Sequence, residues 1–255
     1  MNRLYAPASA RHLIWILLTA LYLPFAWMIL SSLNFSADGA GLFHWYGRVF
    51  SNERWMSAMG RSFAIAVGTS VLATALGLGM VISSRGRFQK VLELFSVLAL
   101  ILPELVFALS LLTWFVVLKF ELSLWTVLIA HVTFSLSFSY FLILSRFRQI
   151  DHQIFEAAED LGAGSLSLFT RVQLPLLWPS LATSGLLCFL LSFDDFLISF
   201  FVNGAGSDTL PLALYSSMKI GLSPELHALA TVMSIVSSVV MYLVLKLSDL
   251  AKMGR

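Results

Sequence analysis

Charged residues are scarce in this chain. Asp, Glu, Lys and Arg make up 12% of its 255 residues, whereas apolar residues make up 58%. A soluble domain carries about 25% charged residues, so this composition excludes a water-soluble fold and requires lipid around the chain. Cysteine is nearly absent. The single Cys188 lies inside an apolar run, which excludes an intrachain disulfide and indicates a small buried side chain. The net charge of +2 is spread over loops and does not indicate a nucleic-acid partner.

The chain also lacks the G-x-x-x-x-G-K-[ST] sequence with which a P-loop holds nucleotide phosphates. We therefore expect a transport subunit without its own ATPase motif, and we expect no cofactor and no metal on this chain. ATP-driven work would need a separate subunit that binds ATP and Mg²⁺.

Long apolar runs are what the sequence has instead. Six of them are long enough to cross about 30 Å of hydrocarbon. They are residues 13–33, 61–82, 91–118, 124–144, 181–201 and 227–247. We therefore expect an all-α polytopic membrane protein, with one transmembrane domain over residues 1–255. The first run is too long for a signal peptide and lacks a convincing cleavage site, so it should remain as a helix kinked at Pro24.

The distribution of basic residues sets the expected orientation. With both termini in the cytoplasm, most of the 16 Lys and Arg residues lie inside. Those left at the outer side are Arg48, Arg54, Arg61, Lys119 and Lys219. This bias agrees with the positive-inside rule, and it places residues 145–180 in the cytoplasm.

Those cytoplasmic residues contain a polar island between the fourth and fifth apolar runs. Residues 149–161 have helical periodicity, and Gly162 supplies the open backbone that ends a helix. Ser165 should cap a second short helix, and Pro175 and Pro179 should restart the chain toward the membrane. The result is a helix, a glycine elbow and a helix. With small side chains exposed, such an elbow suits insertion into a cleft on another protein, although an interfacial loop that only caps the bundle is the alternative.

The island also resembles a known motif. The island consists of Glu156-Ala157-Ala158, three residues, Gly162, nine residues and then Val172-Gln173-Leu174-Pro175. This spacing is similar to that of the EAA loop of bacterial ABC importers. The only departure is Val172, where Ile is common. The resemblance implies a type I ABC importer permease fold and two ATP-binding subunits that dock at residues 145–180. It assigns ATPase coupling to Glu156, Ala157, Ala158, Asp160, Gly162 and Ala163.

A few polar residues lie within the apolar runs. Glu104, His131 and Asp194 each lie about 13 residues from a predicted cytoplasmic end, or roughly 20 Å into the membrane. Carboxylates at this depth cost on the order of 2.5–3.5 kcal/mol each, so they should face a water-filled path or a partner. These acids have no intramembrane Lys or Arg beside them, which suits a cationic substrate. A structural role for the acids, or for His131 as a satisfied core residue, is the alternative.

Neighbouring side chains refine this expectation. Adjacent residues of a helix point about 100° apart, so Asp194 and Asp195 cannot both face one path. One should contact the substrate while the other bonds to a neighbouring helix or to a sister subunit. Phe193 and Tyr140 are weaker candidates for the path, because aromatic faces attract ammonium groups by about 0.5–2 kcal/mol.

A narrower resemblance extends over most of the chain. Several blocks look like the second membrane subunit of the spermidine/putrescine importer family. The strongest are Leu191-Ser192-Phe193-Asp194-Asp195, Leu210-Pro211-Leu212 and Ser223-Pro224-Glu225. The resemblance implies a homologous sister permease, a periplasmic binding protein and a place in the bacterial inner membrane. It implies that residues 210–225 lie outside, where they contact the binding protein or cap the pore.

Other functions remain open at this point. Within the same class, the alternative solutes are another organic cation, an amino-acid derivative or a phosphonate. A secondary transporter would need no EAA elbow and often shows inverted repeats, which are absent. An intramembrane serine protease would need a reactive serine beside His131, and no nucleophile motif accompanies that residue.

Overall fold

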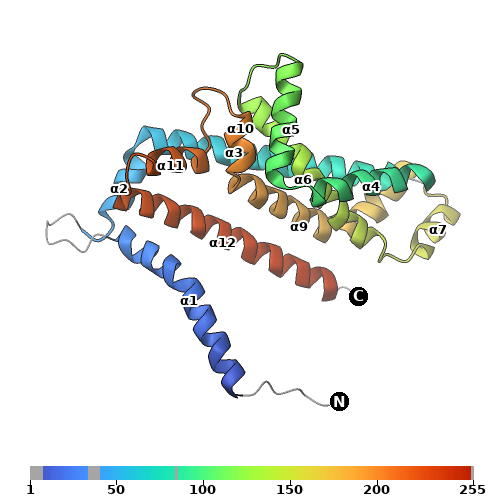
Figure 1. Ribbon diagram of the computed structural model, residues 1–255. Helices are drawn as coiled ribbons and strands as arrows, with labels where there is room; N and C mark the ends of the chain where they lie inside the picture. Colours follow the sequence, from blue (N-terminus) through green and yellow to red (C-terminus); the bar gives the residue numbers. More distant parts are fainter. Residues whose placement is uncertain (1–7, 34–40, 84–85, 254–255) are drawn as a thin grey trace. The chain divides into compact units, whose positions relative to one another are not determined.

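The computed structural model describes residues 8–33, 41–83 and 86–253, and the regular structure in these ranges is helical (Figure 1). The expectation of an all-α chain is confirmed. The first and last residues, which are predicted to be cytoplasmic, lie outside the described residues.

Five helices in these ranges are long and apolar enough to cross a membrane, and a bent pair of helices supplies a sixth candidate. The long helices are α1 (Ala8–Ser32), α3 (Glu53–Ser83), α6 (Leu124–Phe147), the helix Ser165–Phe193 and α12 (Pro224–Met253). The bent pair is α4 (Gly86–Ile101) and α5 (Glu104–Val117). Four shorter helices are α2 (His44–Ser51), α7 (Gln153–Asp160), α10 (Leu197–Val202) and α11 (Leu210–Met218).

The expected span 91–118 is not one continuous helix. Its two halves, α4 and α5, meet at an angle of 111°. Pro103 causes the break, because it has no N–H to donate and disfavours helical backbone at the residue before it. Its own backbone is extended, with φ −56° and ψ 133°, and α5 begins at the next residue, Glu104.

The expected span 181–201 is displaced at both ends. The apolar helix begins at Ser165 as α8 (Ser165–Leu168), continues through the π-helical turn η1 (Phe169–Gln173) and ends with α9 at Phe193. Pro175 and Pro179 therefore lie inside a continuous helix and do not restart the chain. The wide π turn explains this, because it loosens the ladder where Pro175 cannot donate a hydrogen bond. Asp194 and Asp195 then separate α9 from α10.

Contacts divide the chain into two compact units. One comprises residues 1–56 and 214–234, and the other residues 57–213 and 235–255. In the first unit, Trp55 Nε1 donates a 2.7 Å hydrogen bond to Glu225 Oε1 and so joins the start of α3 to the start of α12. In the second unit, α6 packs along α9 and α10 packs on α5 (Figure 1). Every candidate site residue lies in this second unit, and the single domain over residues 1–255 stays a prediction.

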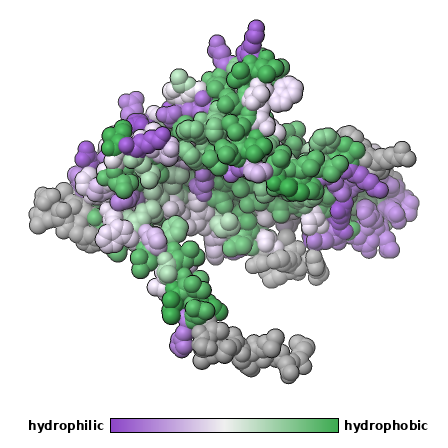
Figure 2. Space-filling view, viewed as in Figure 1, coloured by the Kyte–Doolittle hydropathy of each residue, from purple (hydrophilic) through white to green (hydrophobic). Residues whose placement is uncertain are grey.

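The surface of the second unit is apolar in the places where a membrane protein would face lipid. Apolar side chains cover α4 and α5, whereas hydrophilic side chains gather over α7 (Figure 2). Leu94, Phe95 and Ile101 are 59%, 67% and 71% exposed on α4. Such exposure is costly in water and favourable in hydrocarbon, so these faces are suited to contact with lipid.

A close approach between α3 and α6 depends on Gly77. A Cβ at Gly77 would lie 2.5 Å from Ser139 Oγ and 3.1 Å from the backbone nitrogen of Tyr140. Ser139 Oγ cannot swing aside freely, because it accepts a 2.8 Å hydrogen bond from Ser184. We predict that Gly77→Ala destabilises the protein by about 1–3 kcal/mol through overpacking, measured by thermal unfolding in detergent. Gly79→Ala is the control on the same helix, since a Cβ there meets no described atom within 4 Å. Equal stability of the two variants would contradict the predicted contact.

Candidate functional site

The polar loop between α6 and α9 is a helix that ends in a glycine elbow. Helix α7 ends at Asp160, and Gly162 follows with φ +84°. The N–H of Gly162 donates to the carbonyl of Glu159 at 2.8 Å, and that of Ala163 donates to the carbonyl of Ala158 at 3.0 Å. These two bonds form a Schellman motif, in which glycine takes the left-handed position without strain. The expected elbow at Gly162 is confirmed.

The details of the loop differ from the sequence expectation. Helix α7 begins at Gln153, four residues later than its periodicity predicted. Gly164 takes the cap position of the second helix, and Ser165 is the first residue inside it. The prediction that Ser165 caps the second helix is therefore wrong. Extended backbone at Gly164, with φ −68° and ψ 162°, makes the turn into α8 without a side-chain cap.

One face of α7 holds the elbow against the helix bundle. Phe155 is buried and stacks on Phe147, with ring centroids 5.8 Å apart and planes 18° apart. The opposite face carries exposed Glu156, Ala157 and Asp160. At the tip of the elbow, Leu161 is 90% exposed and Leu166 is 76% exposed. The apolar side chains of residues 149–161 are therefore only partly buried, and the elbow presents small and apolar side chains outward.

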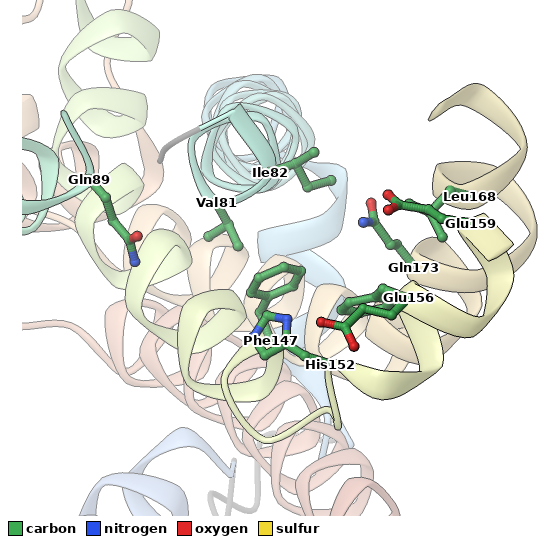
Figure 3. A pocket seen from close by; sticks show the side chains of 10 residues that line it. Val81, Ile82, Gln89, Phe147, His152, Glu156, Glu159, Leu168 and Gln173 are labelled. Atoms are coloured by element: carbon green, nitrogen blue, oxygen red, sulfur yellow. The ribbon is translucent and has the colours of Figure 1, made fainter. Parts of the chain in front are cut away.

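A pocket of about 420 Å³ lies between this loop and the ends of α3 and α6 (Figure 3). Glu156 and Glu159 line it from α7, together with the carboxamide side chains of Gln89 and Gln173. Its apolar walls include Val81, Phe147 and Leu168. Among the residues that the structure describes, no Lys or Arg lines the pocket, so this part of its lining is negative.

The second group of candidate residues lies at the break between α9 and α10. Asp195 is 8% exposed and caps the start of α10. Its Oδ2 accepts a 2.8 Å hydrogen bond from the N–H of Ser199, and its Oδ1 accepts one of 3.3 Å from the N–H of Ile198. A carboxylate in this position satisfies backbone donors that a helix start leaves unpaired, and it complements the helix dipole.

His131 completes a buried network around this cap. Its Nε2 lies 3.0 Å from Asp195 Oδ2 and 3.1 Å from Ser199 Oγ. Its Nδ1 lies 2.7 Å from Ser192 Oγ, which donates a 3.3 Å hydrogen bond to Thr69 Oγ1 on α3. These side chains thus connect α3, α6, α9 and α10. A polar network buried in this way is stable only while every member keeps its partners.

The two aspartates have different environments. Asp194 is exposed, and its Oδ1 accepts a 2.7 Å hydrogen bond from Ser237 Oγ on α12. Asp195 is buried, and its carboxyl lies next to that of half-buried Glu104, the first residue of α5. The break between α4 and α5 therefore meets the break between α9 and α10. The structure brings Glu104, His131 and Asp195 together. Asp194 is not part of this group and contacts α12 instead.

The two aromatic candidates lie apart from each other. Phe193 is 3% exposed and stacks on Phe189, with centroids 5.6 Å apart and planes 11° apart. Tyr140 is fully buried in an apolar cluster with Val81, Ile143 and Leu177. Tyr140 therefore belongs to the core next to the polar loop. A place for either residue on a substrate path stays a prediction.

Comparison with known proteins gives the family. Residues 71–252 match the model of the family described as binding-protein-dependent transport system inner membrane component. The chain belongs to this family.

Two relatives are similar along most of their length. The spermidine/putrescine transport system permease protein PotC of Haemophilus influenzae is 37% identical over 226 residues, which cover 85% of this permease and 87% of PotC. The putrescine transport system permease protein PotI of Escherichia coli is 36% identical over 247 residues, which cover 91% of this permease and 88% of PotI.

Solved structures show the same fold. A bacterial ABC transporter involved in the import of the acidic polysaccharide alginate has a chain that aligns with a TM-score of 0.70 at 19% identity. The alignment covers 96% of this permease and 99% of that chain. A chain of the MetNI methionine ABC transporter aligns with a TM-score of 0.64 at 12% identity, over 76% of this permease and 94% of that chain. The expected type I ABC importer permease fold is confirmed.

The network around His131 also bears on the protease alternative. Ser192, His131 and Asp195 have the hydrogen-bond order of a catalytic triad. All three side chains are buried, however, and Asp195 Oδ2 already accepts the backbone N–H of Ser199. A peptide bond has no access to Ser192 there. In this permease the arrangement holds helices together.

The sequence predictions included His131 and Asp195 of this network and missed Ser192, Ser199 and Thr69. A signal for two of them was present, because Ser192, Asp195 and Ser199 recur at helical spacing of three and four residues. Thr69 carried no such signal, since its contact depends on how α3 packs against α9.

Proposed function

We propose that this permease is one membrane subunit of an ATP-driven importer of polyamines such as putrescine and spermidine. The observation that carries this proposal is the similarity to PotC and PotI over 85–91% of the chain. In this proposal the chain lies in the bacterial inner membrane with both termini in the cytoplasm. It pairs with a homologous sister permease and works with two ATP-binding subunits and a periplasmic binding protein.

The loop at residues 145–180 supplies the contact with the ATP-binding subunits. ATP and Mg²⁺ belong to those subunits and supply the energy. On this chain, Ala157 and Ala163 allow close approach, and exposed Leu161 and Leu166 bury apolar surface in the partner. The negative pocket beside Glu156 and Glu159 suits a basic side chain of the same partner.

Movement of the elbow can be transmitted to the membrane interior through a single helix. Residues Ser165–Phe193 form one helix of 29 residues, or roughly 43 Å at 1.5 Å per residue. This helix starts at the elbow and ends beside Asp194 and Asp195. Displacement of the elbow by the ATP-binding subunits would therefore displace the break that carries the acids. The helix thus acts as a lever between outward and inward openings.

The acids divide between two tasks in this proposal. Asp194 is exposed and Glu104 is half-buried, and this exposure supports contact of the two carboxyls with a polycation. Asp195 and His131 are held in the buried network and position α10. The fold does not choose the sign of the substrate, since a similar fold serves a transporter of an acidic polysaccharide. The acids and the relatives favour a cation.

The outer segment 210–225 has two candidate tasks. Between α11 and α12, Ile220 is 88% exposed and Leu222 is 70% exposed. Exposed apolar side chains at a turn favour contact with another protein, and we assign them to the binding protein. Capping of the pore is the alternative.

Uptake of labelled putrescine and spermidine tests the proposed substrate. The cells lack their own polyamine importers and express this chain with its sister permease, ATP-binding subunit and binding protein. We predict ATP-dependent uptake by the wild type and a loss of about tenfold or more in Asp194→Asn, because one charge that attracts the polycation is removed. Glu121→Gln is the control, since it removes an exposed carboxylate in the turn after α5.

Two outcomes would count against the proposal. Unchanged uptake in Asp194→Asn would remove this residue from the path. A complex that assembles and hydrolyses ATP but imports neither amine would redirect the assignment to another organic cation, an amino-acid derivative or a phosphonate.

A further inference from the structure

A second cavity, of about 610 Å³, lies between the N-terminal parts of α3 and α6. Its lining is apolar except for Arg61 and Ser57. The other lining residues are Gly60, Ala64, Ile65, Leu124, Trp125 and Leu128. Among the described lining residues there is no carboxylate, and Arg61 carries their one charge.

Arg61 is held at one end of this groove, and several of its guanidinium N–H groups are available for a ligand. Its Nε donates a 2.8 Å hydrogen bond to the backbone carbonyl of Asp208. A guanidinium has five N–H donors, and among the described residues only this carbonyl accepts from Arg61. The remaining donors form a fork whose geometry matches a phosphate group.

The depth of the groove follows from the lengths of the two helices. About 20 residues cross the hydrocarbon, whereas α3 has 31 residues and α6 has 24. If the cytoplasmic ends of both helices lie at the inner boundary, Arg61 and Trp125 both fall at the outer headgroup level. Trp125 is 73% exposed there, as expected of an aromatic residue at a membrane interface. Ala64, Ile65 and Leu128 continue the groove into the hydrocarbon.

We propose that this groove binds a phospholipid with an anionic headgroup from the outer leaflet of the membrane. The phosphate lies on the guanidinium of Arg61, the headgroup reaches Ser57, and an acyl chain follows the apolar wall toward Leu128. A polyamine is repelled by Arg61. A soluble binding protein cannot follow a groove that extends to hydrocarbon depth. The amphipathic lining thus selects a lipid.

Gly60 provides a way to close the groove without disturbing the protein. A Cβ at Gly60 meets no described atom within 4 Å, so the side chain of Gly60→Leu extends into the groove. Gly79→Leu is the matched control on the same helix, because its Cβ also meets open space but lies at the other end of α3. Arg61→Gln removes the charge and keeps a polar side chain of similar length.

The test is native mass spectrometry of the purified complex, titrated with phosphatidylglycerol or phosphatidylcholine. We expect retention of phosphatidylglycerol by the wild type and by Gly79→Leu, and a loss of affinity of about tenfold or more in Arg61→Gln and Gly60→Leu. Phosphatidylcholine should bind more weakly than phosphatidylglycerol to the wild type.

Three results would overturn the proposal. They are equal retention of phosphatidylglycerol by all variants, unchanged affinity in Gly60→Leu, and equal affinity of the wild type for the two lipids. Because Arg61 also holds the carbonyl of Asp208, Gly60→Leu decides the matter if Arg61→Gln fails to assemble. The readout is lipid retention, so its result is independent of whether the importer carries polyamines.

Discussion

Replacing Asp195 with alanine is expected to destabilise the permease by about 3–5 kcal/mol. The change removes the acceptor for His131 Nε2 and for the N–H groups of Ile198 and Ser199, all of them buried. Removing one partner of a buried pair leaves the other without compensation, and the loss of a helix cap adds to this cost. Thermal unfolding of the purified chain in one detergent measures the effect.

The adjacent residue provides the control. Asp194→Ala removes an exposed carboxylate with one hydrogen bond, to Ser237, and should cost no more than about 1 kcal/mol. Asp195→Asn should lose less than Asp195→Ala, because asparagine still caps α10. His131→Ala combined with Asp195→Ala should be less destabilised than the sum of the two single changes, since both break one network. A small effect of Asp195→Ala, equal to that of Asp194→Ala, would show that the network does not hold the helix break.

Gly162→Val should abolish uptake while the protein still reaches the membrane. Gly162 has φ +84°, a conformation that costs a β-branched residue about 1–3 kcal/mol. The valine would instead open the Schellman turn and displace α7 from the helix that begins at Ser165. The ATP-binding subunits would then lose their contact with the elbow. Polyamine uptake and the ATPase rate stimulated by the binding protein are the two measurements.

Gly164→Val is the matched control for this prediction. Gly164 lies two residues away, has extended backbone and also has open space around its Cβ position. This variant should retain most of its uptake. Gly162→Asn should be impaired less than Gly162→Val, because asparagine tolerates left-handed backbone. Transport that survives Gly162→Val intact would mean that the elbow does not couple ATP hydrolysis to transport.

The features that were predicted correctly depend on residues close together in sequence. The glycine elbow follows from a helical period that stops at Gly162, and its two hydrogen bonds lie within six residues. The all-α fold follows from apolar runs that only helices can carry across a membrane. The run 91–118 was expected to be one span, so the 111° bend at Pro103 was not predicted.

The wrong predictions are those in which a local sequence rule is overridden by the conformation of the folded chain. Pro175 and Pro179 predict a helix start, yet the helix passes through them because a π turn precedes Pro175. Ser165 has the character of a cap, yet the backbone at Gly164 makes the turn. Leu161 is an apolar residue within the helical period of 149–161, yet it is 90% exposed, which fits a surface that contacts another subunit.

The sequence by itself determined that this chain is a helical membrane protein with a glycine elbow in its longest polar loop. Scarce charge, apolar length and the local conformation of glycine are sufficient for that. Only the tertiary structure decided that Asp195 caps α10 beside His131 while Asp194 remains exposed. It alone placed Arg61 at the end of an apolar groove. Asp194 and Asp195 are the same type of residue in almost the same sequence context. The difference in their exposure therefore comes from the helices that pack on each side.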